Sequence, residues 1–539
     1  MTRRDLVGSA AAAGIGLAAT AWGGRATPNA AGRPLGPPVS SLDGASLLTL
    51  QGWMEDGRVT SKRLCELYLQ RIDALDSGGP SLRSIIEVNP DALVIADRLD
   101  RERKEKGIRG PLHGIPVVIK DNIATADRMQ TTAGSLALVG ARPPRDAHVA
   151  RRLRAAGAVI LGKTNLSEWA NFRSTQSSSG WSGRGGQCLN PYALDRSPCG
   201  SSSGTGAAIA ANLAAVGVGT ETDGSIVCPS AACSLVGIKP TVGRIGRSGI
   251  IPISHTQDTA GPMARSVDEA ALLLEAMAGL DPRDGATKAA STHPLDLGGA
   301  FEPRGLAGAR IGVARKAFFG YSPEADAVIE QSLQAMKDAG AVLIDPSDIP
   351  HTGELDDPEL EVLLYEFKAD LNAYLAELGP SASVHTLADL ISYNEKHRKQ
   401  EMPYFGQELF EEAENKGPLT DKAYRDALAL CRRLSRKEGL DPVFAKHRLD
   451  AIVAPTGSPP WTIDLINGDH FLGASSTPAA VSGYPSLTVP AGYSFGLPVG
   501  ITFIGKAWME AKLIRLAFAF EQATRVSKPP RFLPMADLR

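Results

Sequence analysis

One lysine and two serines of this sequence, each in its own local setting, could together cleave an acyl bond. Lys120 ends an apolar run, Ser201 lies in a stretch of small residues at 199–206, and Ser225 follows a predicted turn. A serine hydroxyl becomes an effective nucleophile only when a base takes its proton. We therefore interpret the three residues as parts of a serine hydrolase in which a lysine, not a histidine, is the base.

A lysine can be that base only when it is neutral. At the reference pKa of about 10.4, only about one lysine in a few thousand is neutral at pH 7. Burial disfavours the charged form and lowers the pKa by several units. Lys120 ends a predicted strand whose apolar residues indicate burial, so we expect its stem to enter the interior. The alternative is a lysine that reaches from the strand end to solvent.

The two serine segments also supply backbone N–H groups that could bind a developing oxyanion. Glycines within 199–206 let the backbone approach a ligand closely, and the N–H groups of residues 222–225 could converge at the predicted turn. For Ser225 alone the alternative is a helix N-cap, and for the loop it is a linker or a phosphate cradle. The candidate oxyanion and substrate-binding residues are Thr222, Asp223, Gly224 and Ser202.

Two short motifs match but are rejected on physical grounds. Residues 157–164 fit the P-loop pattern G-x-x-x-x-G-K-[ST]. A P-loop needs a strand before the first glycine and flexible residues between the glycines, whereas here a predicted helix precedes the match and its apolar centre is typical of a strand. Residues 200–204 fit the nucleophile elbow G-x-S-x-G. An elbow follows directly on a buried strand, but the residues before this match are typical of turns. We therefore predict neither a nucleotide site nor a Ser-His-Asp triad on Ser202.

The elements that must position these residues alternate between strand and helix. This alternation predicts an α/β protein, with one sheet and helices on both of its faces. Residues 355–445 are helical and charged, and could be a lid or a helical insertion. The expected strands are at 83–88, 115–119, 159–161, 216–222, 310–314, 342–344, 451–454, 486–489 and 500–504, and the expected helices include 146–156, 207–215, 323–339 and 510–525.

Composition restricts the classes of function. The 539 residues carry a formal net charge of −2, which gives no overall field to recruit nucleic acid or anionic lipid. Six cysteines include no C-x-x-C pair, so we expect no structural zinc site, and the nine histidines include no H-E-x-x-H motif. The oxidation state of Cys228, Cys233 and the other cysteines stays open.

Residues 1–30 are predicted to be an export signal. Arg3 and Arg4 begin a segment that resembles a twin-arginine motif, and an apolar stretch rich in Ala and Gly follows. The stretch is too short for a membrane span, and no later run reaches the roughly 18 apolar residues that one needs. We expect export to the periplasm or beyond, no stable membrane anchor, and a linker at 31–45; the alternative is a frayed apolar tail.

Several stretches, in the same order along the chain, resemble the amidase signature family. The family pattern G-I-P-x-x-x-K-D-N matches residues 114–122. Variants of G-G-S-S-G-G-S and G-T-D-T-G-G-S-I-R-x-P stand at 199–205 and 219–229. The resemblance covers about residues 45–270 and is weaker towards the C-terminus. Further matches lie at 131–135, 162–165, 237–241 and 258–266.

The resemblance implies the amidase signature fold, with a large central mixed β-sheet covered by helices on both faces, in a single domain over 46–530. It also implies a Ser-cisSer-Lys triad, with Ser225 as the nucleophile and Ser201 as the bridging serine behind a cis peptide bond. Lys120 would take the Ser225 proton through Ser201 and later return it to the leaving amine. An acyl-enzyme would form on Ser225 and be hydrolysed by water, without metal or cofactor.

Two departures from the family pattern lie beside the nucleophile. Glu221 replaces the usual Asp, and Asp223 replaces a Gly. These segments look most like the peptide amidase branch, which removes the C-terminal amide of peptides and releases ammonia. The expected partner is thus a peptide or small-molecule amide, bound by a monomer or homodimer without nucleic acid.

Other functions remain open at this point. One is an amidase of small aryl or aliphatic amides. Another is the amidase subunit of a glutaminyl-tRNA amidotransferase, which would need partner subunits and a location in the cytoplasm. A fatty-acid amide hydrolase would need an apolar membrane-docking patch, and none is evident. From a different class, an exported solute-binding protein would hold its ligand in the loop at 199–206 without turnover.

Overall fold

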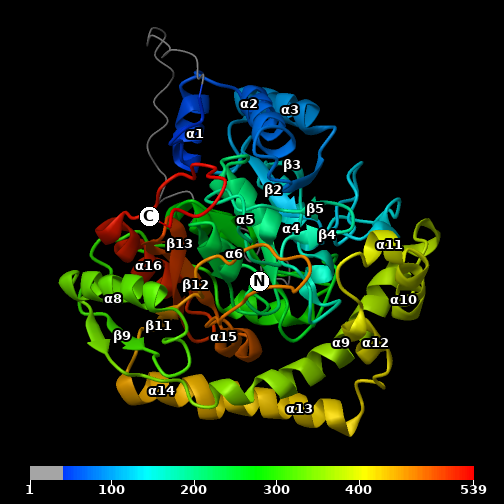
Figure 1. The fold of residues 1–539 in the computed structure, drawn as a ribbon. Helices are drawn as coiled ribbons and strands as arrows, with labels where there is room; N and C mark the ends of the chain where they lie inside the picture. Colours follow the sequence, from blue (N-terminus) through cyan, green and yellow to red (C-terminus); the bar gives the residue numbers. More distant parts are fainter. Residues whose placement is uncertain (1–40, 539) are drawn as a thin grey trace, which may run out of the picture.

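The structure is a computed structural model and describes residues 41–538 (Figure 1). The predicted export signal at 1–30 and residues 31–40 of the predicted linker lie outside the described residues. Within them, no helix combines the length and the apolar character that crossing a membrane requires.

In residues 41–538, eleven strands form one mixed sheet in the order β1-β3-β2-β6-β8-β7-β12-β13-β11-β9-β10. Strand pairs β2/β3, β2/β6, β9/β10 and β9/β11 are parallel, and the other neighbours are antiparallel. The bounds are β1 Ile85–Val88, β2 Pro116–Lys120, β3 Val159–Thr164, β6 Val216–Glu221, β7 Val236–Lys239, β8 Thr259–Ala264, β9 Arg310–Val313, β10 Val342–Ile344, β11 Ala451–Pro455, β12 Ser486–Ser494 and β13 Leu497–Ile504. The large α/β sheet expected from the sequence is confirmed, and β4 (Trp181–Ser182) and β5 (Gly186–Gln187) form a separate two-stranded sheet.

Helices cover both faces of this sheet. The chain moves from β2 to the adjacent β3 through α4 (His148–Ala155), then back past β2 to β6 through α5 (Ser203–Ala210). Because parallel crossovers are right-handed, two crossovers in opposite directions lie on opposite faces. The other helices around the sheet are α1 Leu47–Glu55, α2 Ser61–Arg71, α3 Ala92–Lys106, α6 Val227–Ala232, α7 Val267–Met277, α8 Pro323–Asp338, α15 Thr477–Ser482 and α16 Glu510–Thr524.

Residues 355–445 are helical, as their composition predicted, and they border the lower and right sides of the molecule in Figure 1. The long helix α9 packs against α12 and α13, and the π-helical stretch after α13 packs against α15. The bounds are α9 Asp356–Glu377, α10 Leu387–Lys396, α11 Arg398–Glu401, α12 Glu408–Glu414, α13 Lys422–Arg432, the π-helical stretch Arg433–Leu440 and α14 Asp441–His447.

The strand order decides where the site forms. β2 and β6 are parallel neighbours, so their C-terminal ends, with Lys120 and Glu221, meet at the same edge of the sheet. β8 runs antiparallel to β6 and therefore begins at this edge with Asp258 just before it. The loops before α5 and α6, which carry Ser201 and Ser225, lie over the same edge.

The structure corrects two expectations about elements. The helix expected at 207–215 is α5, which spans Ser203–Ala210. It ends earlier than expected because Asn212, which precedes β6, adopts a left-handed φ of 56°. The motif segments at 237–241 and 258–266, to which no strand was assigned, contain β7 and β8. The sequence of β8 is Thr-Ala-Gly-Pro-Met-Ala, which has a low intrinsic preference for strand. Pairing with the neighbouring strands β6 and β7, and not its own residues, therefore stabilises it as a strand.

Candidate active site

Lys120 lies at the centre of the site and is fully buried. Its Nζ donates hydrogen bonds to Ser201 Oγ at 2.7 Å and to the Thr220 carbonyl at 3.2 Å. Burial lowers the pKa of Lys120 to about 7, and the carboxylates of Asp258 and Glu221 limit the fall because they favour the charged form. The amine thus titrates near neutral pH, which suits a proton-transfer group.

Ser201 follows a cis peptide bond from Gly200, as the family resemblance implied. A side chain at Gly200 would place its Cβ 2.2 Å from Ser167 Oγ, so only glycine fits this close approach. The carbonyl of Ser201 accepts a hydrogen bond from the Ser167 N–H at 3.1 Å. These contacts fix the backbone that presents the Ser201 hydroxyl to Lys120.

Ser225 lies in the loop between β6 and α6 and is half-buried. Its carbonyl accepts a hydrogen bond from the Ser202 N–H at 3.3 Å, which joins the two serine loops. Within residues 41–538, the Ser225 side chain and the N–H groups of Asp223, Gly224 and Ser225 have no hydrogen-bond partner. Gly224 adopts a φ of +77°, which turns the chain at this point. A free hydroxyl beside free N–H donors is the arrangement that an acyl substrate needs.

The two departures from the family pattern have separate structural roles. Glu221 accepts hydrogen bonds from the N–H groups of Ile226 and Val227 at 2.7 and 3.0 Å and so holds the start of α6. The Asp223 carboxylate accepts a hydrogen bond from Thr477 Oγ1 at 2.7 Å, which ties the Ser225 loop to the start of α15. Burial raises the pKa of Asp223, and the hydroxyls of Ser476 and Thr477 oppose this rise.

Ser202 and Thr222, two of the predicted oxyanion or substrate residues, use their hydroxyls within the protein. Ser202 Oγ donates to the Thr220 carbonyl at 3.0 Å and accepts from the Thr220 N–H at 3.2 Å. Thr222 Oγ1 donates to Asp258 at 2.6 Å. Both hydroxyls are therefore engaged in positioning, and Asp258, whose pKa burial raises to about 6, becomes part of the site.

A disulfide bond that sequence reasoning left open connects Cys199 and Cys228. It links the residue before the Gly200–Ser201 peptide to the helix that follows Ser225. Trp461 packs against this pair. The cysteines are 29 positions apart in the sequence, and no local pattern marks them as partners.

The structure agrees with the rejection of both short motifs. Residues 159–164 of the P-loop match are the buried strand β3, in which Lys163 Nζ donates to the Ile123 carbonyl and to Thr131. In the described chain, no strand immediately precedes the G-x-S-x-G match at 200–204.

The described residues contain one cluster with metal-ligand spacing, His255, Glu366 and Asp370. Hydroxyl groups and the Thr256 N–H already donate hydrogen bonds to Glu366, so this cluster ties α9 to the loop before β8.

Comparison with known proteins shows similarity over nearly the whole chain. The family model described as Amidase matches residues 63–514. The chain is 45% identical over 504 residues to an Arabidopsis thaliana protein described as a probable amidase, with 92% of each chain covered.

Solved structures resemble this chain in both sequence and fold. The native peptide amidase from Stenotrophomonas maltophilia is 52% identical with a TM-score of 0.87, over 91% of this chain and 99% of that one. An amidase family protein from Bacillus anthracis is 37% identical with a TM-score of 0.82, over 91% and 93% of the two chains.

Proposed function

Because the chain belongs to the amidase family, we propose that it hydrolyses the C-terminal amide of peptides to the free acid and ammonia. One observation carries the chemistry: a buried lysine with a lowered pKa is hydrogen-bonded to Ser201, in a loop joined to the Ser225 loop. The substrate class rests on the 52% identity to a peptide amidase whose chain is covered almost completely.

In the proposed reaction, Ser225 Oγ attacks the amide carbonyl carbon. Its proton passes to Ser201 Oγ as the Ser201 proton passes to the neutral Lys120 amine. The N–H groups of Asp223, Gly224 and Ser225 would stabilise the oxyanion of the tetrahedral intermediate. When the C–N bond breaks, the proton returns from Lys120 through Ser201 to the leaving nitrogen, and ammonia departs.

The second half of the cycle uses the same groups. Water gives up a proton along the same relay and attacks the ester carbonyl of the Ser225 acyl-enzyme. Cleavage of the ester bond returns a proton to Ser225 and releases the peptide acid. Ser202 and Thr222 position the two loops in this proposal and do not contact the reacting atoms.

The first test measures ammonia release from a short peptide carrying a C-terminal amide. Ser225→Ala should lower the rate about ten-thousand-fold or more, because it removes the nucleophile. Ser230→Ala is the matched control, since Ser230 is a nearby buried serine whose hydroxyl has no hydrogen-bond partner among the described residues. The control should keep the rate of the unchanged protein.

Other outcomes of this test would revise the proposal. Turnover of small aryl or aliphatic amides, dependent on Ser225 but absent with peptide amides, would keep the triad and change the substrate class. Absence of any turnover would contradict the proposal and favour a binding role or a missing partner protein. The latter is relevant because the chain is also 35% identical to a glutamyl-tRNA(Gln) amidotransferase subunit from Chloroflexus aurantiacus.

We further propose that the protein is exported through a twin-arginine-type signal and acts on its substrate without a nucleic-acid partner or a membrane anchor. The support is the Arg3-Arg4 segment and its apolar stretch. Replacement of both arginines by lysine should keep the protein in the cytoplasm, as measured by cell fractionation. Unchanged export of this variant would contradict the proposed route.

A further inference from the structure

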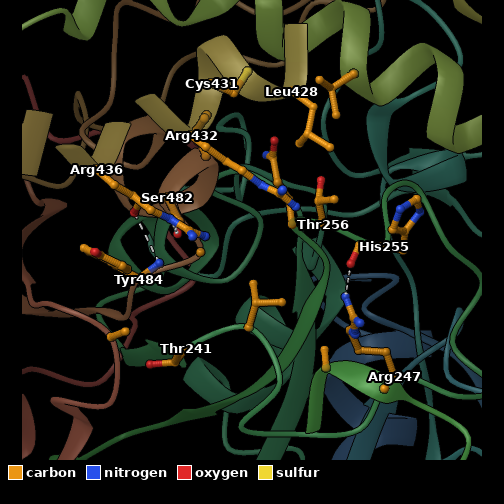
Figure 2. A pocket seen from close by; sticks show the side chains of 18 of the residues that line it. Thr241, Arg247, His255, Thr256, Leu428, Cys431, Arg432, Arg436, Ser482 and Tyr484 are labelled. Carbon is orange, nitrogen blue, oxygen red and sulfur yellow. Dashed lines mark hydrogen bonds between the residues drawn. The ribbon is translucent and has the colours of Figure 1, made fainter. Parts of the chain in front are cut away.

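A cavity of about 580 Å³ lies beside the catalytic site, between the end of β7, α15 and the helix α13 (Figure 2). None of Lys120, Ser201 and Ser225 lines it. Two segments separate it from the triad: Gln257 lines the cavity and precedes Asp258, and α15 ends at the cavity and begins at Thr477. Its size is that of pockets that hold small organic molecules.

Three arginines line this cavity, and their charges are compensated to different degrees. The Arg247 guanidinium is neutralised by Asp284, with two hydrogen bonds at 2.7 and 2.8 Å. Arg436 Nε donates to the Ser482 carbonyl at 2.7 Å, but the Arg436 guanidinium forms no ion pair with a carboxylate of the described residues. The Arg432 guanidinium has neither a hydrogen bond nor an ion pair in that part of the chain.

Arg432 and Arg436 are four positions apart on one continuous helical stretch, and both side chains extend into the cavity in Figure 2. Like charges at this spacing repel and destabilise a helix. The two guanidiniums present their remaining N–H donors towards one space. An anion held between them would receive charge-assisted hydrogen bonds from both and relieve the repulsion.

The rest of the wall suits the apolar body of a ligand. Val481, Leu428, Tyr484 and Trp508 line the cavity together with the arginines. The Tyr484 ring lies under the Arg436 guanidinium, 5.7 Å from its centroid, so the cationic and aromatic surfaces adjoin. A cavity with two uncompensated cations and an aromatic wall fits a ligand that is both anionic and apolar.

We propose that this cavity is a second ligand site, which binds a small organic anion with an apolar or aromatic body. The acidic group, a carboxylate or a phosphate monoester, binds between Arg432 and Arg436. The body of the ligand lies against Leu428, Val481 and Tyr484. This site is separate from the amide-cleaving site and does not depend on which amide the triad cleaves.

Isothermal titration calorimetry of the whole protein tests this site with benzoate, phenyl phosphate and the neutral benzyl alcohol. Binding of at least one anion, and no binding of benzyl alcohol, is expected. Arg432→Gln should weaken that binding about tenfold or more, because one charge-assisted contact is lost. Arg433→Gln is the matched control, since Arg433 is the adjacent exposed residue, pairs with Glu438 and does not line the cavity.

A second variant, Leu428→Glu, places a carboxylate in the cavity wall and should also weaken anion binding. Both Arg432→Gln and Leu428→Glu should keep the rate of amide cleavage. Tighter binding of benzoate would assign a carboxylate as the acidic group of the ligand, and tighter binding of phenyl phosphate would assign a phosphate monoester. Three results would overturn the proposal: no binding of either anion up to about 10 mM, unchanged binding in Arg432→Gln, or equal weakening by Arg432→Gln and Arg433→Gln.

Discussion

The disulfide between Cys199 and Cys228 joins the loop that presents Ser201 to the helix that follows Ser225. The hydrogen bond from the Ser202 N–H to the Ser225 carbonyl lies between the same two segments. The two serines belong to loops that follow different strands, so their relative position depends on such cross-links. In our proposal the proton passes directly between them, and a small displacement would interrupt its transfer.

Loss of this disulfide should therefore lower both stability and activity. For a closed loop of this length, Cys199→Ala with Cys228→Ala should lower the free energy of unfolding by about 3–4 kcal/mol. Urea unfolding and the rate of ammonia release measure the two effects. Cys431→Ala is the control, because Cys431 is buried but not disulfide-bonded. Equal unfolding midpoints with and without a reductant would contradict this prediction.

The pH dependence of the rate should follow the protonation of Lys120. Only the neutral amine can accept a proton, so kcat/KM should fall about tenfold per pH unit below the Lys120 pKa of about 7 and reach a plateau above it.

Asp258→Asn tests the assignment of this titration to Lys120. The Asp258 carboxylate favours the charged lysine, so its removal should lower the Lys120 pKa and move the acid limb to lower pH. The position of the limb, and not the height of the plateau, is the readout. A limb that stays in place or moves to higher pH would assign the titration to another group.

The contact between Thr477 and Asp223 should matter for the chemical step. Thr477→Val removes the hydroxyl that holds the Asp223 carboxylate, and it leaves a buried acceptor with fewer partners. We expect kcat to fall about tenfold, because the loop that carries the oxyanion N–H groups loses a support. Thr477→Ser keeps the hydroxyl and should restore the rate. A Thr477→Ser variant that is as slow as Thr477→Val, although it keeps the hydroxyl, would contradict this role of the hydrogen bond.

Arg173 should be essential for the attachment of the helical region to the sheet. It is fully buried, donates to Glu168 at 2.8 Å and to the Glu401 carbonyl, and lies over the Phe405 ring. Arg173→Met would leave the buried carboxyl group of Glu168 without its cation, and should lower the free energy of unfolding by about 3–5 kcal/mol. Denaturant unfolding measures this loss.

The pH dependence of that loss identifies its cause. Burial already raises the pKa of Glu168 although Arg173 opposes the rise, so removal of Arg173 raises it further. The folded variant then keeps the Glu168 proton to a higher pH than the folded unchanged protein, so the stability difference between the two proteins widens as the pH rises through the Glu168 pKa of the unchanged protein. Adding Glu168→Gln should recover part of the loss. A penalty that is independent of pH, with no recovery, would show that the loss comes from packing alone.

Much of the site could be predicted from the sequence because each part carries a local signal. The apolar run before Lys120 predicts a buried strand end, and the small residues around Ser201 predict a closely approached loop. The order of motifs indicates the family, and the strands β2, β3, β6 and β9 to β13 follow from apolar runs. These properties depend on neighbours in the chain, which is why the sequence alone shows them.

Tertiary structure alone decided the contacts between distant segments. Neighbouring residues in the sequence do not indicate that Cys199 bonds to Cys228 or that Thr477 donates to Asp223. They also do not predict a strand at β8, which contains a glycine and a proline. The tertiary structure also brings Arg432 and Arg436 to one cavity with residues of α15 and with Thr241 and Val242, which follow β7. Burial, charge compensation and strand pairing depend on which segments meet, and this is settled only when the whole sheet has formed.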